Sequence, residues 1–246
     1  MSRFYRGCFI TATNTGVGKT TVTAALARRL ASDSLRPGVM KPIETGMRPD
    51  HAHETDTARL QRAAGSAEPR SLACPYAFPD ALSPLAASRR AGITIEFARI
   101  REAYQTLAAR HDLMLVEGVG GVRVPITPHA DMRDLIEALG LPVLVVGQAA
   151  LGGINHALLT LESLRARTLH VLGLVLNQPS PQPEDPGVTL QRESTIELIR
   201  ELAGIPVLGP LPHVAGLDRQ WDHGIAQLAA TPAIGDLTRL LQATSS

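Results

Sequence analysis

A glycine-rich turn near the start of the chain most constrains its fold, because it lies between an apolar run and a helical pattern. The apolar run begins at Cys8, the turn ends in Gly18-Lys19-Thr20, and an apolar helical face follows at Val22, Ala25, Leu26 and Leu30. Backbone N–H groups at the start of a helix bind phosphate oxygens, and glycines let the backbone come close to them. The pattern therefore predicts a phosphate-binding loop rather than an ordinary glycine turn. In such a loop Lys19 meets the β- and γ-phosphates, and Thr20 offers its hydroxyl to Mg²⁺.

The loop departs from the common spelling G-x-x-x-x-G-K-[ST], because Thr13 stands at the position of the first glycine. Its sequence is closer to the variant K-G-G-x-G-K-[ST], but Asn14 stands where that variant begins with lysine. The choice between branches of phosphate-loop proteins therefore depends on the rest of the chain.

Length and composition limit the possible classes of protein. With 246 residues, 44% hydrophobic and 19% charged, the chain is long enough for one α/β domain or two small ones. We expect a single domain over residues 1–246, because no linker or repeat interrupts the pattern. A net charge of +1 and only eight aromatic residues give no case for nucleic acid or an acidic membrane surface as partner.

Two further features concern the compartment. No apolar stretch reaches the roughly 20 residues of a membrane span, and the N-terminus lacks a secretory apolar region, because Phe9-Ile10 soon meets the polar loop. Cys8 and Cys74 form neither a disulfide framework nor a metal site by their spacing, so we expect buried or half-buried thiols. These features favour a cytoplasmic protein.

Strand-like and helical patterns alternate along the chain. The apolar, strand-like runs are Cys8–Thr11, Gly38–Lys41, Leu113–Glu117, Val143–Gly147, Val171–Leu176 and Pro206–Gly209. Helical faces lie between several of them, at Phe97, Ile100, Tyr104 and Leu107, at Ile154, Leu158, Leu161 and Leu164, and at Ile196, Ile199 and Ala203. This alternation predicts an α/β fold with a mainly parallel sheet flanked by helices. Ligands then bind outside the carboxyl ends of the strands.

Two proline-rich regions interrupt the pattern. Residues 66–92 are expected to form a long ordered loop with a short helix, and residues 178–188 an exposed loop. A final helix is expected from Ala233 to Leu241.

Three charged residues outside the phosphate loop lie at strand ends or at a helix start. Glu117 ends a buried strand, where phosphate-loop proteins place an acid that holds Mg²⁺ directly or through water. Asp56 opens a capped helix, so it is either a second acid of the Mg²⁺ site or an ordinary first-turn acid. Lys41 ends a strand before a proline and either points at a ligand or is simply exposed. Locally, neither alternative is preferred for Asp56 or Lys41.

Two glycine-rich segments complete the pattern. Gly118, Gly120 and Gly121 let the loop after Glu117 pass close to phosphates. The run Gly152-Gly153-Ile154-Asn155 opens a helix after a strand, and the unpaired amides of such a helix start suit a carboxylate. The alternative for the second segment is a plain turn with Asn155 near the cap.

Taken together, these segments resemble the dethiobiotin synthetases. The similar pieces occur in family order and cover residues 7 to about 215. They are Thr15–Thr21, Lys41-Pro42-Ile43-Glu44-Thr45-Gly46, the helix at Asp56, Pro75-Tyr76 with Ser83-Pro84, Val116-Glu117-Gly118-Val119-Gly120-Gly121, Leu151-Gly152-Gly153-Ile154-Asn155-His156-Ala157, Gly173-Leu174-Val175-Leu176-Asn177 and Leu208-Gly209-Pro210-Leu211-Pro212. The sequence departs from the family at Ala12, where many members have glycine, at Gly16, which is acidic in some members, and over residues 178–195.

The resemblance implies a single-domain phosphate-loop fold and an ATP-dependent ligase of biotin biosynthesis. This enzyme closes a ring on 7,8-diaminopelargonic acid (7,8-diaminononanoate) with CO₂ and ATP, through a carbamate and a carbamic-phosphoric anhydride. Lys41 and Lys19 correspond to the catalytic lysines, and Thr20, Asp56 and Glu117 to the Mg²⁺ site. The ATP-binding positions correspond to Gly16, Val17, Gly18, Lys19, Thr20, Thr21, Asp56, Glu117, Gly118, Val119, Gly120, Asn177, Gln178, Leu211, Pro212 and His213.

The resemblance also implies where the diamine binds. Thr15, Lys41 and Thr45 correspond to positions near the diamine or carbamate. The helix start at Gly152, Gly153, Ile154 and Asn155 corresponds to the element that binds the distal carboxylate across a homodimer interface.

Three other functions share the phosphate loop. A partition ATPase of the ParA/MinD type is disfavoured by Asn14 in place of the signature lysine and by the lack of a basic patch. An amidotransferase-type ligase such as cobyrinate diamide synthase needs a glutaminase domain, for which the chain is too short. A regulatory nucleotide-binding module remains as a third alternative, and phosphate release with and without diamine plus bicarbonate separates it from an enzyme.

Overall fold

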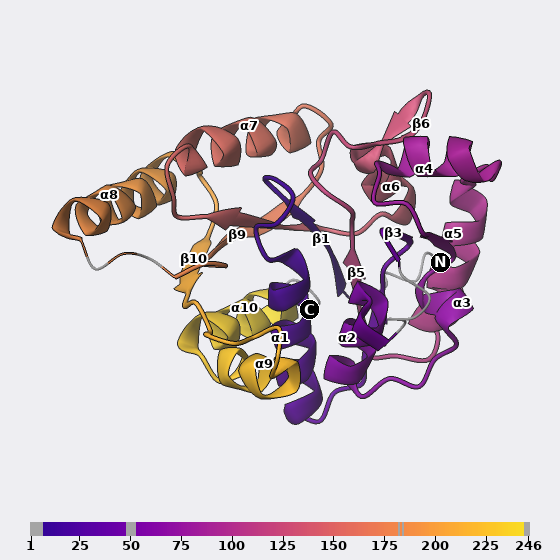
Figure 1. Cartoon of the computed structure of the whole chain (residues 1–246), viewed down its shortest axis with the longest axis horizontal. Helices are drawn as coiled ribbons and strands as arrows, with labels where there is room; N and C mark the ends of the chain where they lie inside the picture. Colours follow the sequence, from indigo (N-terminus) through magenta and orange to yellow (C-terminus); the bar gives the residue numbers. More distant parts are fainter. Residues whose placement is uncertain (1–6, 48–52, 182, 184, 244–246) are drawn as a thin grey trace.

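The computed structural model describes residues 7–47, 53–181, 183 and 185–243 (Figure 1). Parts of three expectations lie outside these residues. They are the domain over residues 1–246, the loop over residues 178–188 and the absence of a secretory segment at the N-terminus.

Six parallel strands form the central sheet, in the order β10-β9-β8-β1-β5-β2 (Figure 1). The strands are β1 (Gly7–Ala12), β2 (Pro37–Met40), β5 (Leu113–Glu117), β8 (Val143–Gln148), β9 (Val171–Asn177) and β10 (Val207–Leu211). They are the six strands predicted from the apolar runs, so the expected parallel α/β sheet is confirmed. The register pairs Ile10 with Glu117, which brings the carboxyl ends of β1 and β5 to the same edge.

Helices cover both faces of this sheet (Figure 1). One face carries α1 (Lys19–Ser32), α2 (Asp56–Ala64), α9 (Trp221–Ala229) and α10 (Pro232–Ala243), and the other carries α5 (Phe97–Ala108), α6 (Met132–Leu139), α7 (Gly153–Arg165) and α8 (Pro186–Leu202). The smaller elements are β3 (Ile43–Thr45), α3 (Arg70–Ala73), β4 (Tyr76–Phe78), α4 (Pro84–Ala91), β6 (Pro125–Thr127) and β7 (Ala130–Asp131). The strand pair β3–β4 is parallel and the pair β6–β7 is antiparallel.

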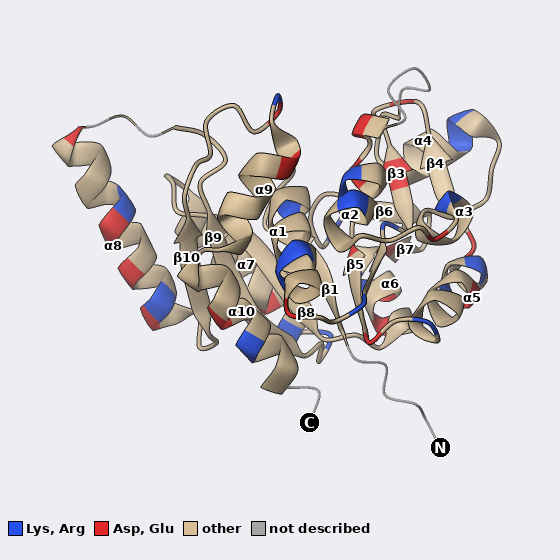
Figure 2. Ribbon diagram, turned by 90° about the horizontal axis from the view of Figure 1, so that it is seen from below, with Lys and Arg blue, Asp and Glu red and all other residues tan. Residues whose placement is uncertain are grey.

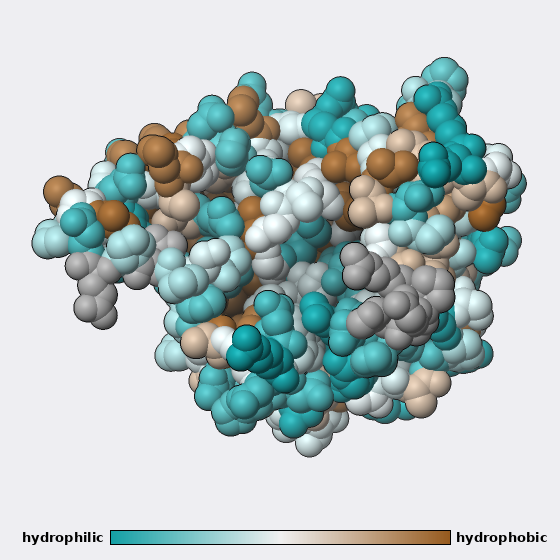
Figure 3. Space-filling view, viewed as in Figure 1, coloured by the Kyte–Doolittle hydropathy of each residue, from teal (hydrophilic) through white to brown (hydrophobic). Residues whose placement is uncertain are grey.

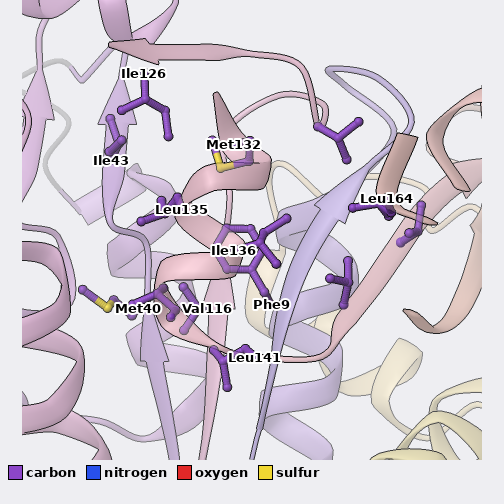
Figure 4. Packing of buried hydrophobic residues seen from close by; sticks show 14 of the residues in the cluster. Phe9, Met40, Ile43, Val116, Ile126, Met132, Leu135, Ile136, Leu141 and Leu164 are labelled. Atoms are coloured by element: carbon purple, nitrogen blue, oxygen red, sulfur yellow. The ribbon is translucent and has the colours of Figure 1, made fainter. Parts of the chain in front are cut away.

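Each face of the sheet has its own hydrophobic core. Along β1, Cys8 and Ile10 pack into the core under α1, while Phe9 points into the opposite core beside α6. Figure 4 shows Phe9 in that second core together with Val116 and Ile136. This alternation follows from the two-residue period of a strand, and each fully buried side chain of this size contributes about 1.5–3 kcal/mol. The sheet is thus a rigid base for the loops at its carboxyl edge.

Residues 66–92 differ from the expectation. They contain two helices, α3 and α4, and the strand β4, rather than a long loop with one short helix. The prediction was wrong because the prolines begin elements instead of breaking them: Pro69 is the N-cap of α3, and Pro84 is the first residue of α4. Pro186 likewise begins α8, so the described part of the loop after Gln178 is shorter than expected.

The C-terminal region is more ordered than the sequence indicated. The expected final helix is α10, and α9 precedes it without having been predicted. Both cysteines are buried and free, as expected, and burial raises the pKa of Cys8 to about 12 and that of Cys74 to about 11. Within the described residues, none of the helices combines the length and apolar character that crossing a bilayer requires.

Candidate active site

The phosphate loop connects β1 to α1 and needs glycine at its last position. Gly18 is the N-cap of α1 with φ of 94°, a left-handed conformation that side chains disfavour. A Cβ atom there would lie 2.1 Å from Nδ2 of Asn177. The close contact exists because the Asn177 amide donates a hydrogen bond of 2.9 Å to the carbonyl of Val17. The end of β9 therefore holds the loop in place.

Lys41 lies at the centre of a buried group of charges. It follows β2 directly, and its ammonium group lies 2.6 Å from Oδ2 of Asp56 and 2.5 Å from Oε1 of Glu117. The hydroxyl of Thr20, at the start of α1, donates a hydrogen bond of 2.8 Å to the same Oε1 atom. The phosphate-loop helix, the end of β5 and the start of α2 thus meet at one point.

The charges of this group set its protonation. Burial alone would lower the pKa of Lys41, but the carboxylates of Glu117 and Asp56 more than offset it and raise the pKa above its usual range. Burial would raise the pKa of Asp56, and the ammonium of Lys41 instead holds it below its usual range. Lys41 is therefore a permanent cation at neutral pH.

Lys19 behaves differently from Lys41. Burial lowers the pKa of Lys19 to about 8, because the opposing attraction of Glu117 is weaker than the desolvation and Lys41 adds repulsion. Within the described chain, the ammonium group of Lys19 thus lacks a strong anionic partner. Lys19 and Lys41 are the two lysines of the chain, which otherwise uses arginine for its cations.

Glu44 positions Asp56 and was not predicted as part of the site. It is buried, and its carboxylate accepts hydrogen bonds of 2.6 Å from the backbone N–H of Asp56 and from the hydroxyl of Thr57. Glu44 thereby accepts a hydrogen bond from a backbone N–H group in the first turn of α2, where Thr55 is the N-cap. The sequence carried a signal for this role, since Glu44 follows Lys41-Pro42 closely, but only the fold brings it to α2.

A cavity of about 580 Å³ opens above these residues. Most of the predicted site residues line it, namely Thr15, Gly16, Gly18, Lys19, Thr20, Thr21, Lys41, Thr45, Asp56, Val119, Gly120, Asn177, Gln178, Pro212 and His213. Val17, Glu117, Gly118 and Leu211 do not line it, and all four are buried. The lining residues that the sequence reasoning missed are Arg59, Pro179, Val214, Gly216, Leu217, Asp218, Trp221 and Leu228.

The remaining predicted residues lie elsewhere. Gly152, Gly153, Ile154 and Asn155 form the start of α7 and do not line the 580 Å³ cavity of their own chain. Gly152 is the N-cap, and no side chain caps this helix. A second cavity of about 470 Å³ separates α7 from the phosphate loop and is lined by Thr13, Asn14, Thr15, Gly121, Val122, Arg123, Val124, Pro125, His156, Leu159, Thr160 and Ser163.

The donor set at Lys41 fits a magnesium ion that is shared with a phosphate ligand. Among the described residues no group of three or more His, Cys, Asp or Glu side chains is placed to hold a metal ion. Mg²⁺ typically needs only one or two carboxylates, since waters and phosphates complete its shell. Oε2 of Glu117 is buried and has no hydrogen-bond partner within the described chain, so an acceptor remains to be satisfied.

The fold and the site together define a phosphate-loop protein, with a Lys-Thr pair at a helix start and an acid at the end of the neighbouring strand. A family model described as an AAA domain matches residues 6–220. The chain belongs to the family of ATP-dependent dethiobiotin synthetases. It is 46% identical to the member from Anaeromyxobacter dehalogenans (strain 2CP-C) over 75% of this chain and 82% of the relative. It is 38% identical to the member from Thermodesulfovibrio yellowstonii over 87% of this chain and 91% of the relative. The resemblance seen in the sequence is confirmed.

Solved structures show the same fold at low sequence identity. The MinC:MinD complex of Aquifex aeolicus aligns with a TM-score of 0.57 at 13% identity, over 98% of this chain and 95% of the other. A ParA family ATPase from Chlorobium tepidum aligns with a TM-score of 0.56 at 13% identity, over 95% of this chain and 98% of the other. At such identity the likeness shows the phosphate-loop α/β fold alone.

Proposed function

We propose that this chain, as one domain, makes dethiobiotin from 7,8-diaminononanoate, CO₂ and ATP. One amine of the diamine forms a C–N bond with CO₂ and loses a proton, which gives a carbamate. A carbamate oxygen attacks the γ-phosphorus, and the bond to ADP breaks. The second amine then attacks the carbamate carbon, closes the ring and releases phosphate.

The contact of Lys41 with both Asp56 and Glu117 beside the phosphate loop carries this proposal. The reaction must bring two anions together, a carbamate and a triphosphate, so fixed cations must neutralise them. Lys41 is buried, permanently charged and lines the 580 Å³ cavity, while Lys19 begins α1 directly after the phosphate loop. We assign Lys41 to the carbamate and Lys19 to the β- and γ-phosphates.

Thr20, Asp56 and Glu117 would hold Mg²⁺. Two carboxylates and a hydroxyl are the oxygen donors this ion prefers, directly or through water. Bound there, the ion would neutralise the phosphate oxygens and lower their repulsion for an incoming anion.

The far end of the cavity fits the base of the nucleotide. The amide nitrogen of Asn177 is held by Val17, which leaves its carbonyl oxygen to accept a hydrogen bond from a base amine. Gln178, Pro212 and His213 line this end, and Leu211 lies beneath them. We assign these residues, with the backbone of Gly16–Thr21 and Gly118–Gly120, to ATP binding.

We further propose a homodimer that completes the diamine site. Thr15 and Thr45 line the 580 Å³ cavity, and so does Lys41, but the start of α7 does not, so in this proposal a partner copy supplies that helix start. Large apolar side chains are exposed on and before α7 and on α8, with exposed fractions of 83% for Leu151, 56% for Leu159 and 68% for Leu190. Figure 3 shows apolar surface over this part of the molecule, and Figure 2 shows both acidic and basic residues along α8. Such a mixed surface suits a second copy of the same chain.

The decisive experiment measures phosphate release and incorporation of labelled bicarbonate with purified protein, ATP and Mg²⁺. We expect both signals to require the diamine and to be stoichiometric with each other. Phosphate release that is indifferent to the diamine would instead indicate an ATPase switch. No release, with nucleotide binding intact, would indicate a regulatory module.

A further inference from the structure

Arg59 is a cation that lines the 580 Å³ cavity and has no role in the chemistry proposed above. It lies on α2, one helical turn after Asp56, and both side chains line the 580 Å³ cavity. Its charge reaches the site, because it helps to hold the pKa of Asp56 low, after the larger effects of burial and of Lys41 and Thr20.

Within the described part of the chain, the side chain of Arg59 forms no ion pair and no hydrogen bond, whereas its backbone N–H donates to the carbonyl of Thr55. Asp218 also lines the cavity but forms no ion pair with Arg59. Among the described residues, no acceptor therefore takes a hydrogen bond from the five N–H donors of the Arg59 guanidinium.

The ring of Trp221 holds Arg59 in position. The guanidinium carbon lies 4.5 Å from the centroid of the indole, so the two groups stack as a cation–π pair. Trp221 is the single tryptophan of the chain and is 8% exposed, and its ring nitrogen makes no hydrogen bond within the described chain. The ring face is therefore what this residue contributes. Stacking covers one face of the guanidinium and leaves the N–H groups at its edge available.

The contact between Arg59 and Trp221 joins α2 to the C-terminal segment. Trp221 begins α9, and the next residue, Asp222, lies 3.6 Å from the guanidinium of Arg62. Helix α9 also packs along α1, the helix that follows the phosphate loop. Arg59 thus lies between the charged group at Lys41 and the cavity wall formed by residues 214–228. A bound nucleotide would extend along this wall from its phosphates to its base.

We propose that Arg59 binds the phosphate tail of the nucleotide and that Trp221 is its positioning residue. A guanidinium recognises phosphate oxygens through paired, charge-assisted hydrogen bonds, which are stronger than neutral ones. The inference rests on the proposed ATP site and adds to it a contact from α2 that is held by the C-terminal segment.

The first test compares Arg59→Ala with Arg62→Ala. Arg62 is a matched control, since it lies on the same helix and contacts α9 but does not line the cavity. Calorimetry with Mg²⁺ measures the affinities for ATP and for inorganic tripolyphosphate, which has no ribose or base. We expect Arg59→Ala to weaken both ligands about tenfold or more, the effect of one lost charge-assisted bond, and Arg62→Ala to stay within about twofold of wild type.

The second test concerns Trp221. We expect Trp221→Phe to keep most of the ATP affinity, because a ring face remains, and Trp221→Leu to lose about as much as Arg59→Ala. Thermal unfolding of each variant identifies any loss of fold. If Trp221→Leu does not fold, Trp221→Phe and Arg59→Ala still decide the test.

Several outcomes would overturn the inference. Wild-type affinity in Arg59→Ala would remove Arg59 from the site. A loss for ATP but not for tripolyphosphate would mean that Arg59 reads the ribose or base, and an altered KM for the diamine with unchanged ATP affinity would assign it to the other substrate. ATP affinity in Trp221→Leu that matches wild type would remove the positioning role. If wild-type protein itself failed to bind ATP, the proposed function would fail, which is a separate result.

Discussion

The ammonium group of Lys41 lies 2.5 Å from Oε1 of Glu117, the same oxygen atom that accepts the hydroxyl of Thr20. The lysine proposed for the carbamate therefore binds an oxygen atom of the acid proposed for Mg²⁺. A cation that binds Glu117 competes with Lys41, so we expect metal binding to loosen this ion pair and release the ammonium group toward substrate. The neighbouring contact of Lys41 with Asp56, at 2.6 Å, adds to this competition.

Replacing Lys41 by Gln is expected to separate nucleotide binding from catalysis. The phosphate loop is unchanged, so ATP affinity should stay close to that of wild type. Product should fall by about 10²–10³-fold, because the loss of one fixed donor at a developing charge has this effect. Lys41→Arg should not restore full activity, since arginine keeps the charge but not the compact shape. Calorimetry and incorporation of labelled bicarbonate measure the two properties. Normal incorporation in Lys41→Gln would exclude Lys41 from the mechanism, and lost ATP binding would make it an ATP-site lysine.

The acids of the site are expected to control the magnesium requirement. Asp56→Asn and Glu117→Gln each remove one charged donor, so the Mg²⁺ concentration for half-maximal turnover should rise at least about tenfold. Glu137→Gln is the control, because Glu137 lies on the exposed side of α6, where it pairs with Arg167. Mg²⁺ titrations that match wild type in both site variants would contradict a shared metal site.

ATP affinity is expected to fall as the pH rises above about 8. Lys19 has a pKa of about 8 in the empty site because it is buried, and bound phosphates should raise this value. Binding therefore takes up a proton at pH 9 but not at pH 7, so affinity is nearly constant below pH 8. Above pH 8 it should drop by up to about tenfold per unit.

Because the chain has two lysines, NMR of protein labelled with ¹³C at the lysine ε-carbon should show two signals. The Lys19 signal should titrate near pH 8 without nucleotide and at higher pH with it, while Lys41 stays protonated. A Lys19 signal that first titrates near pH 10.5 in the empty site would refute this account.

Gly18→Ala is expected to disrupt the loop more than a comparable change elsewhere. Both Gly18 and Gly65 have positive φ, at 94° and 64°, so an alanine at either position is strained by about 1–2 kcal/mol. Only at Gly18 does the new Cβ meet a neighbour, Nδ2 of Asn177 at 2.1 Å, whereas nothing lies within 4 Å at Gly65. Gly18→Ala should therefore also break the bond from Asn177 to Val17 and weaken ATP binding at least about tenfold. Equal ATP affinities in the two variants would show that the Asn177 contact is unimportant.

The sequence predicted those parts of the site that depend on local pattern. The phosphate loop, the six strands and the positions of Lys41 and Glu117 follow from short runs, because strand ends and helix starts have characteristic residues. Topology then brings these residues together, since the carboxyl ends of parallel strands share one edge.

The parts that were not predicted depend on contacts between distant segments. Glu44 supports Asp56 only because β3 ends beside the start of α2, and Trp221 meets Arg59 only because α9 packs next to α1 and α2. Neither relationship has a spacing that can be read along the chain. The position of Arg59 had a local signal, as it follows Asp56 by one helical turn.

The distal carboxylate of the diamine is expected to determine much of its affinity. Helix α7 begins at Gly153 with no side-chain cap, and its positive dipole end is suited to an anion. The methyl ester of the diamine should therefore bind at least about tenfold more weakly than the acid, while ATP affinity stays the same. Gly153→Ala should reduce this preference, because its Cβ would lie 2.4 Å from the carbonyl oxygen of Gln148 and displace the helix start.

Calorimetry measures the ligand affinities. Analytical ultracentrifugation of Leu159→Asp tests the contribution of a second copy, because we place the exposed apolar side chain of Leu159 in the dimer interface. Equal binding of acid and ester would exclude the α7 start as the carboxylate site. An active wild-type enzyme that sediments only as a monomer would exclude the partner copy.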